Sequence, residues 1–253
     1  MIASPTVHPS AFSVSCHADP IVELKQDDEC LSSLRAGFAV PSLRLWTAAP
    51  SVIVSKRESE LPHFERAASV LQEKGWPIFV RRTGGTICPL GPGILNLSYV
   101  SRFKFADGFS AAASYRWFCR KLLQSVSNCG VAGTIGSVPG CYCDGGYNIV
   151  VSGKKLIGTS QRCVPISRDY KDVALLMHAT ILVSADKERL CHIVNRFNAL
   201  TEQEAVASEN ALINLTEIDS SGGKGDIKDT LMDALVEAFH PGVNTWEYPV
   251  SNC

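Results

Sequence analysis

The chain has 253 residues, of which 45% are hydrophobic and 19% are charged, and its formal net charge is −1. This length and composition exclude a mainly disordered protein and predict one large folded domain. A net charge near zero argues against a nucleic-acid binder, whose basic excess should be visible in the count. No apolar run approaches the roughly 20 residues of a membrane-spanning helix. We therefore expect a protein that binds neither nucleic acid nor membrane.

The first 20 residues are rich in Ser, Pro and Thr and contain no Lys or Arg. This composition lacks the basic and apolar regions of a secretory signal, so we expect a loose N-terminal arm over 1–20. Ten cysteines are spread over a chain that is too large to need disulfide staples, which favours reduced thiols and a cytoplasmic protein. Only Cys141 and Cys143 are closely spaced, and without a second pair they predict no metal site.

Hydrophobic spacing and breaker residues predict the elements of the first half of the chain. Acidic and basic residues among apolar ones predict an amphipathic helix at 21–38, and Gly75 ends a second helix. The strands at 43–46 and 51–54, joined by Ala-Ala-Pro, are expected to be a hairpin or neighbours. The elements in order are a helix at 21–38, strands at 43–46 and 51–54, a helix at 64–74, and strands at 76–80 and 94–100.

The second half contains the clearest helix signal, a wide apolar face over 109–128, for which we expect core packing. Gly153 suits the positive φ of a tight hairpin turn. The other expected elements are a hairpin of strands at 147–151 and 155–158, a strand at 173–183, and helices at 191–200 and 227–239. Helices and hairpin strands do not alternate one for one, so we predict an α+β fold, a mainly antiparallel mixed sheet flanked by helices. Residues 21–253 should form a single catalytic domain, with a small helical C-terminal region from about 187.

A glycine turn with two arginines at its entrance, Arg-Arg-Thr-Gly-Gly-Thr at 81–86, follows the expected strand at 76–80. Glycines have no Cβ and let backbone amides approach a ligand closely. Arginines beside such a turn supply cationic donors for a carboxylate or phosphate. Taken alone, this segment is more often only a simple turn.

Five segments, taken in order, resemble the motif series of the lipoate and biotin protein ligase family. They are Arg-Arg-Thr-Gly-Gly at 81–85, Gly-Ile-Leu-Asn-Leu-Ser at 93–98, Tyr-Asn-Ile at 147–149, Gly-Lys-Lys-Leu-Ile-Gly-Thr-Ser-Gln-Arg at 153–162 and His-Ala-Thr-Ile-Leu at 178–182. The match covers roughly residues 20–240. The resemblance implies a lipoate/biotin ligase-like catalytic domain with an apolar tunnel, which transfers a lipoyl, octanoyl or biotinyl group to a lysine on a carrier domain.

In that family the glycine loop wraps the acyl chain and its activated carbonyl, and the lysine of the Gly-Lys-Lys hairpin points at the reacting group. By position this lysine is Lys155. A cation placed where an oxyanion develops stabilises the transition state. The substrate-binding residues that the resemblance implies are Arg81, Arg82, Thr83, Gly84, Gly85, Asn96, Asn148, Gly158 and Thr159.

The family includes transferases that use a cysteine nucleophile a few residues before the Tyr-Asn strand. Cys143 matches best by its distance to Tyr147, and Lys155 on the adjacent hairpin could lower the pKa of its thiol. The resemblance therefore implies an acyltransferase of protein lipoylation with Cys143 and Lys155 as catalytic residues. An ordinary buried cysteine is the alternative interpretation of Cys143.

Other functions remain open at this point. An ATP-dependent lipoate-protein ligase, which needs ATP and Mg, usually has a histidine shortly after the glycine turn, and residues 86–91 contain none. The transferase needs no cofactor. A non-catalytic binder of acylated carriers is a third hypothesis, and biotin transfer is disfavoured because no Gly-Arg-Gly-Arg segment is present. His178 is a candidate base or a core residue, and the loop at 220–225 a candidate anion site.

The resemblance also implies the partners. We expect lipoyl-carrier domains, either the glycine cleavage H protein or the E2 lipoyl domains of 2-oxoacid dehydrogenases, together with an octanoyl or lipoyl group.

Overall fold

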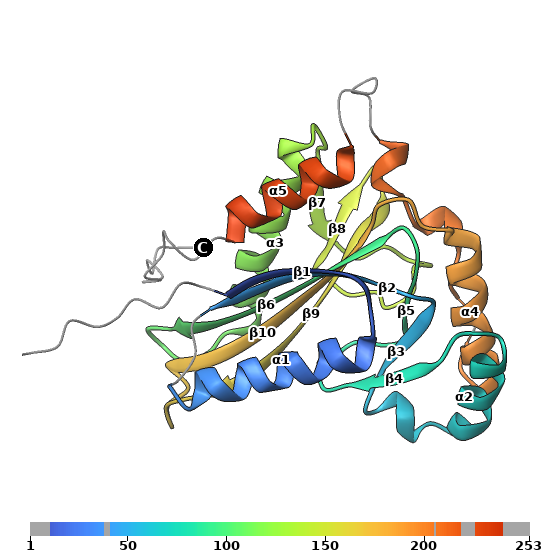
Figure 1. The fold of residues 1–253 in the computed structure, drawn as a ribbon, viewed down its shortest axis with the longest axis horizontal. Coiled ribbons are helices and arrows are strands. Elements are labelled where there is room, and N and C mark those ends of the chain that lie inside the picture. The colour runs from blue at the N-terminus through green and yellow to red at the C-terminus, as the bar shows by residue number, and fades with distance from the viewer. Residues whose placement is uncertain (1–10, 38–40, 205, 219–225, 240–253) are drawn as a thin grey trace, which may run out of the picture.

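Two β-sheets and five α-helices make up the part of the chain that the structure, a computed structural model, describes, namely residues 11–37, 41–204, 206–218 and 226–239 (Figure 1). The strands are β1 (Ala11–Ala18), β2 (Ser42–Ala48), β3 (Ser51–Ser55), β4 (Ile78–Arg81), β5 (Cys88–Leu90), β6 (Ile94–Lys104), β7 (Thr134–Gly136), β8 (Asn148–Val151), β9 (Lys154–Pro165) and β10 (Asp172–Leu182). The α-helices are α1 (Pro20–Arg35), α2 (Phe64–Glu73), α3 (Ala111–Asn128), α4 (Lys187–Leu200) and α5 (Ile227–Phe239). Short 3-10 helices occur at Glu58–Glu60, Glu209–Ala211 and Leu215–Glu217.

The larger sheet has seven strands in the order β1-β2-β6-β10-β9-β8-β7. Its β1–β2 pair is parallel and its other pairs are antiparallel. The smaller sheet has the order β4-β3-β5, with β3 parallel to β4 and antiparallel to β5. The predicted α+β class with a mainly antiparallel mixed sheet is therefore confirmed.

The central strand β10 separates two environments, because successive side chains of a strand point to opposite faces. Its odd-numbered residues, including Met177 and Ile181, join a large apolar core with α3 and α5. Its even-numbered residues include His178 and Thr180, which face away from that core. Figure 1 shows α3 and α5 on one side of this sheet and α1 on the other. The odd-numbered face of β10 thus packs in the core, and the even-numbered face contributes His178 and Thr180 to a polar site.

The helix α3 packs its aromatic stripe against the sheet, as predicted. Phe118 and Trp117 are buried, and both rings contact Phe239 of α5. The hydroxyl of Ser110 caps the helix by accepting a hydrogen bond from the Ala113 amide at 3.2 Å. This face is closed by apolar side chains and carries no candidate chemistry.

Helix α1 covers the opposite face and buries an unusual combination of residues. Leu31 and Leu34 pack against β6 and β10. Asp27, one turn before Leu31, and Glu23, one turn before Asp27, are also buried. Asp19 caps the helix through its carboxylate, which accepts from the Ile21 amide at 3.0 Å. Burial of two acids requires partners on the sheet, and these belong to the site described below.

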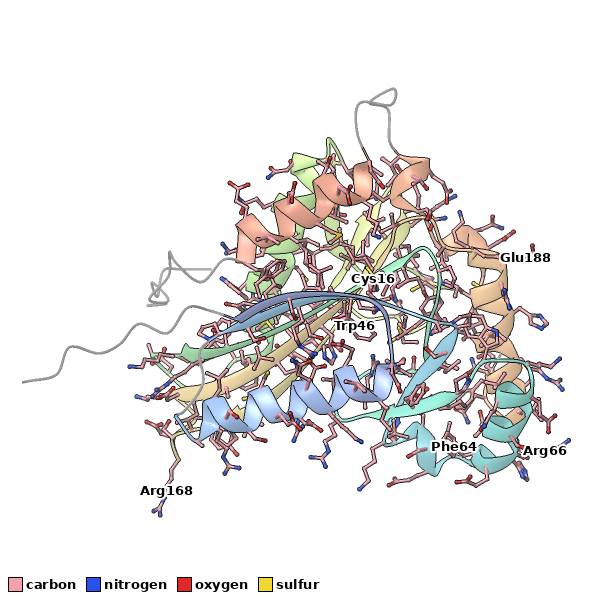
Figure 2. The ribbon with its side chains drawn as sticks, viewed as in Figure 1. Cys16, Trp46, Phe64, Arg66, Arg168 and Glu188 are labelled. Carbon is pink, nitrogen blue, oxygen red and sulfur yellow. The ribbon has the colours of Figure 1, made fainter. Side chains whose placement is uncertain are left out.

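A second apolar cluster joins the small sheet to α2 and α4. It includes Val52, Leu71, Phe197 and the buried Trp46 of β2. In Figure 2, Arg66 of α2 and Glu188 of α4 point away from the body of the protein.

Two expectations about connectivity are wrong. Residues 11–18 form β1, which extends the large sheet beside β2, and Pro20 begins α1, so the expected loose arm does not reach residue 20; residues 1–10 lie outside the described residues. The strands β2 and β3 are not a hairpin, because they belong to different sheets. Ala49 and Pro50 redirect the chain between the sheets, and a local pattern does not distinguish such a corner from a turn.

The other predicted elements begin within four residues of their predicted positions, but β9 continues seven residues beyond its predicted end, and β5 and β7 have no predicted counterpart. The hairpin turn between β8 and β9 has φ of 50° at Ser152 and 75° at Gly153, the left-handed geometry expected there. Among the described residues, no helix combines the length and the apolar composition needed to cross a membrane. The predicted loop at 220–225 lies outside the described residues. The assignment of 21–253 to one domain stays a prediction.

Candidate active site

Three segments that are far apart in the sequence meet at one cavity. Arg81 ends β4, Cys143 lies in the connection between β7 and β8, and Lys155 is the second residue of β9. The residues that line the cavity are Arg81, Cys88, Tyr142, Cys143, Lys155, Gly158, Thr159, Ser160, His178, Thr180 and Leu182. The structure thus brings both predicted catalytic residues to one place.

The thiol of Cys143 is held by donors from the glycine turn. Its Sγ accepts a hydrogen bond from the backbone amide of Thr86 at 3.3 Å and lies 3.7 Å from Nη2 of Arg81. The backbone of Cys143 is left-handed, with φ of 46°, a conformation that non-glycine residues adopt rarely and that is enriched at functional sites. The loop therefore directs the sulfur at the cationic turn.

Glycine is required at position 85 for this contact. Gly85 has φ of 102°, and a Cβ built there would lie 2.9 Å from Sγ of Cys143 and 2.7 Å from Nη2 of Arg81. Both contacts are too short for any side chain to be tolerated without moving the thiol or the guanidinium. Steric contact with the thiol and the guanidinium thus explains why the second residue of the Gly-Gly pair is a glycine.

Lys155 is buried beneath the cysteine loop. Its Nζ donates to the carbonyl of Tyr142 at 2.7 Å and to that of Cys143 at 3.0 Å, and it lies 5.0 Å from the centre of the Tyr142 ring. A Cβ at Gly158 would lie 2.9 Å from Cε and 3.0 Å from Nζ of Lys155. Gly158 therefore leaves room for the lysine, and the lysine fixes the loop that carries the thiol.

Electrostatics distinguish Cys143 from its neighbours. Burial by itself raises the pKa of the Cys143 thiol, but the charges of Arg81 and Lys155 favour the thiolate. The Thr86 amide adds a hydrogen bond to the sulfur, and the pKa of Cys143 lies below its ordinary value as a result. By contrast, burial raises the pKa of Cys141 to about 12. Two thiols in one loop are thus placed in opposite environments.

The loop around Cys143 is fixed by an acidic side chain next to it. Oδ1 of Asp144 accepts from the amide of Val138 at 2.9 Å and from Nδ2 of Asn148 at 2.7 Å. Asn148 also donates to the carbonyl of Gly145 at 2.9 Å. Asn148, predicted to bind substrate, therefore supports the cysteine loop and is absent from the residues that line the cavity.

A second cavity adjoins the first and shares Arg81, Cys88, His178 and Thr180 with it. Its other lining residues are largely apolar: Leu24, Trp46, Ile53, Leu90, Leu97 and Ala179, together with Asn96. An apolar group would leave water favourably in this space.

A buried polar network closes the site on the side of α1. His178 Nε2 lies 2.8 Å from Oδ2 of Asp27, and its Nδ1 lies 3.4 Å from Oγ1 of Thr83. Arg44 of β2 forms ion pairs with Asp27 and with Glu23. Burial opposes ionisation of Asp27, yet His178 and Arg44 hold the pKa of its carboxyl below its ordinary value. The two buried acids of α1 thus have cationic partners on the sheet.

The predicted residues are distributed unevenly around the cavity. Thr83 is buried behind it, and Oγ1 of Thr159 donates to the Tyr147 carbonyl at 2.7 Å. Arg82 points outward, 69% exposed, and pairs with Asp28 at 3.5 Å. Gly84 is exposed with no atom within 4 Å of a built Cβ. Arg82 and Gly84 are therefore not among the residues that surround Cys143.

Sequence reasoning missed several lining residues. Cys88 lies in the segment after the glycine turn, and Ser160 and Thr180 lie within quoted motifs. Alternation along 173–183 could have placed Thr180 and Leu182 on the face of His178. Asp27 carried no signal, since an acid in an amphipathic helix is usually solvated. Among the described residues, no group of three or more His, Cys, Asp and Glu side chains could hold a metal ion.

Comparison with known proteins gives consistent matches. Residues 19–240 match the family model of the lipoyl protein ligase A/B catalytic domain. An octanoyl-GcvH:protein N-octanoyltransferase of Kyrpidia tusciae is 32% identical over 85% of this chain and 76% of its own length. A lipoyl-GcvH:protein N-lipoyltransferase of Listeria monocytogenes is 28% identical over 64% of this chain and 56% of its own.

A solved structure of lipoate-protein ligase A bound with ATP superposes with a TM-score of 0.66 at 19% identity, covering 92% of this chain and 85% of that one. At this identity the likeness concerns the fold. The resemblance deduced from the five motifs, and the expectation of an enzyme of the lipoyl transferase and ligase family, are confirmed.

Proposed function

The chain belongs to the lipoyl protein ligase A/B catalytic domain family, and from that premise we propose that it moves an octanoyl or lipoyl group onto a carrier-protein lysine through a thioester on Cys143. The two transferase relatives, which act from acylated GcvH, support a donor of the same kind. The acceptor is then the lysine of a lipoyl-carrier domain, such as the glycine cleavage H protein or an E2 lipoyl domain. The reaction needs no cofactor.

The observation that supports this function best is the position of the Cys143 sulfur. It meets the Thr86 amide and the Arg81 guanidinium on the wall of a cavity. A thiol whose pKa is lowered in this way forms the nucleophilic thiolate more readily, whereas a merely structural cysteine is buried among apolar groups. The difference from Cys141 argues for a role in chemistry.

In the proposed reaction the Cys143 thiolate attacks the carbonyl carbon of the acylated donor. The C–S bond forms, the C–N bond breaks, the leaving nitrogen takes a proton from water and departs as the carrier amine, and an acyl-thioester remains on the enzyme. An acceptor lysine then attacks the thioester carbon and displaces the thiolate. The cations of Arg81 and Lys155 stabilise the thiolate at both stages, and the apolar cavity near Trp46 holds the chain.

Intact-mass analysis tests the proposal. The protein and Cys143→Ala are incubated with octanoylated H protein in the absence of ATP. We expect a mass gain of one octanoyl group that hydroxylamine removes and that the variant lacks. Cys141→Ala is the matched control, because it removes a thiol from the same loop, and it should gain the octanoyl group.

Two results would refute the thioester mechanism. Acylation of an apo carrier by both the wild type and Cys143→Ala, with ATP and Mg required, would identify an ATP-dependent ligase. Binding of an acylated carrier without turnover under either condition would identify a non-catalytic binder.

A further inference from the structure

A chain of hydrogen-bonding groups runs from the cavity into the interior. Ser160 lines the cavity beside Cys143, and its Oγ donates to Oγ1 of Thr83 at 3.4 Å. Oγ1 of Thr83 lies 3.4 Å from Nδ1 of His178, and Nε2 of His178 lies 2.8 Å from the carboxylate of Asp27. The imidazole also lines the cavity itself, with 13% of its side chain exposed. The proposed thioester chemistry does not use this chain.

The partners of His178 determine which of its nitrogens carries the hydrogen. A hydrogen bond from His178 and the guanidinium of Arg44 favour the ionised form of Asp27, and an ionised carboxylate only accepts hydrogen bonds. Nε2 of His178 is therefore the donor toward Asp27. In the neutral ring Nδ1 then has a free electron pair, which faces the hydroxyl of Thr83. That hydroxyl receives a hydrogen bond from Ser160 and can donate its own hydrogen to Nδ1.

In the second step of the proposed reaction, the carrier lysine attacks the thioester, and this step needs a group that accepts a proton. A lysine side chain has a pKa near 10.4 and is an ammonium at neutral pH, without an electron pair for attack. Lys155 does not suit the role of acceptor, because its Nζ already donates to the carbonyls of Tyr142 and Cys143. Arg81 remains protonated under all these conditions.

We propose that His178 accepts the proton of the incoming carrier lysine, directly or through the Thr83 hydroxyl, and that Asp27 positions its ring. This inference rests on the proposed function and adds an acceptor of protons to it. The ammonium loses one proton to His178, and the nitrogen electron pair forms the C–N bond. The C–S bond breaks with its electrons moving to Cys143, and the second nitrogen proton passes to water. One imidazolium, one thiolate, one amide and one released proton result, with charge conserved.

The charged surroundings of His178 fit this role from each side. Asp27 on α1 stabilises the imidazolium that forms, and Arg44 on β2 lies beyond that carboxylate. Arg81 on β4 shares the cavity wall with His178 and stabilises the thiolate rather than the amine. The acid and the guanidinium are thus placed for the two opposite charges that the step creates.

The test separates loading of Cys143 from its discharge. p-Nitrophenyl octanoate loads the full-length enzyme with octanoate, because its phenolate leaves without needing a proton. The loaded enzyme is then mixed either with apo H protein or with hydroxylamine, an amine that is already neutral at pH 7. Intact mass follows the loss of the octanoyl group in His178→Asn, Asp27→Asn and the wild type.

We expect His178→Asn to load normally and to react normally with hydroxylamine, but to transfer to apo H protein about 10²- to 10⁴-fold more slowly. Asp27→Asn should show a smaller loss in the same step alone. Thr83→Val should also slow it, and Thr83→Ser, which restores a hydroxyl, should recover most of the rate. His192→Asn changes an exposed histidine on α4 and should match the wild type.

Three outcomes would overturn the inference. Equal slowing of both discharge reactions in His178→Asn would indicate a structural role. An unchanged rate toward apo H protein would show that another group takes the proton. Absence of any octanoyl adduct on the wild-type enzyme would remove the thioester and refute both this inference and the proposed function, whereas the first two outcomes leave the proposed function intact.

Discussion

The two faces of the strand β10 are built from the same backbone and serve opposite purposes. On one face, Met177 and Ile181 belong to the apolar core that contains the aromatic side chains of α3 and α5. On the other, His178 and Thr180 line a cavity with Cys143 and face the buried acids of α1. Burial opposes ionisation of both acids: His178 and Arg44 outweigh it at Asp27, whereas the pKa of Glu23 is raised by burial despite its ion pair with Arg44.

The two faces of β10 thus separate the residues that stabilise the fold from the residues that line the candidate site. Apolar packing on the α3 and α5 side holds the sheet, so that the strands can present polar side chains on the α1 side at fixed spacing. Substitutions on the apolar face should therefore change the free energy of unfolding. Those on the polar face should change turnover in protein that is still folded.

The largest effect is expected at the nucleophile. Cys143→Ala should lower turnover by about 10⁴-fold or more, since removal of a covalent nucleophile leaves only binding and electrostatic contributions. Cys141→Ala, two residues away, should keep most of the activity. Steady-state transfer of octanoate between carriers measures both. Similar losses in the two variants would mean that the loop, and not the Cys143 thiol, matters.

The apolar face should respond in stability. Phe118→Ala removes a fully buried ring that packs on Phe239, and we expect it to lower the free energy of unfolding by about 3 to 5 kcal/mol. Urea denaturation measures the loss. Arg120→Ala, on the exposed side of α3, is the control and should change it little. Acyl-enzyme formation by the folded fraction of Phe118→Ala should equal that of the wild type, and a specific loss there would contradict the separation of the faces.

Loss of the Lys155 charge should also lower the turnover rate, although less than loss of the Cys143 thiol. Lys155→Met keeps an unbranched side chain that reaches Cε and removes the ammonium, and we expect turnover to fall about 10²- to 10³-fold. The adjacent Lys154→Met is the matched control and should stay near the wild-type rate. Both rates are measured together with thermal melting. If Lys155→Met lost activity only in proportion to lost folding, the lysine would be a scaffold for the loop alone.

Much of the fold could be predicted from local patterns, because each helix and strand carries its own periodicity. The stripe of α3 and the turn at Gly153 are examples. The corner between β2 and β3 could not be predicted, because sheet membership depends on contacts across the whole chain. The strand β1 could not be predicted for a related reason, because its polar and apolar residues form a strand only through pairing with β2.

The site was predicted in part. Cys143, Lys155 and Gly85 were found because motifs place them in order, and the structure adds the reason that Gly85 must lack a Cβ. The roles of Asp27 and Arg44 could not be predicted, because an acid on a helix and an arginine on a strand are usually solvent-exposed, and only the folded structure shows that these two form a buried ion pair. Burial of charge is a property of tertiary structure, and a single sequence does not record it.

The smallest predicted effect concerns the pH dependence of the two loop thiols. The thiolate is the form that reacts with iodoacetamide. The pKa of Cys143 lies below its ordinary value, so its alkylation rate should rise with pH and level off at a lower pH than that of an ordinary cysteine thiol. With a pKa of about 12, Cys141 should react about tenfold faster with each pH unit between 6 and 9, without a plateau.

Cys141→Ala and Cys143→Ala isolate the two thiols, and peptide mass spectrometry between pH 6 and 9 measures each rate. Arg81→Met removes the largest stabilising charge on the Cys143 thiolate, so the plateau of Cys143 should move to higher pH. The same change should affect Cys141 little, because Lys155 is the cation that acts on that thiol. Parallel profiles for the two thiols would mean that the cationic turn does not act on Cys143, and the contrast within the loop would be lost.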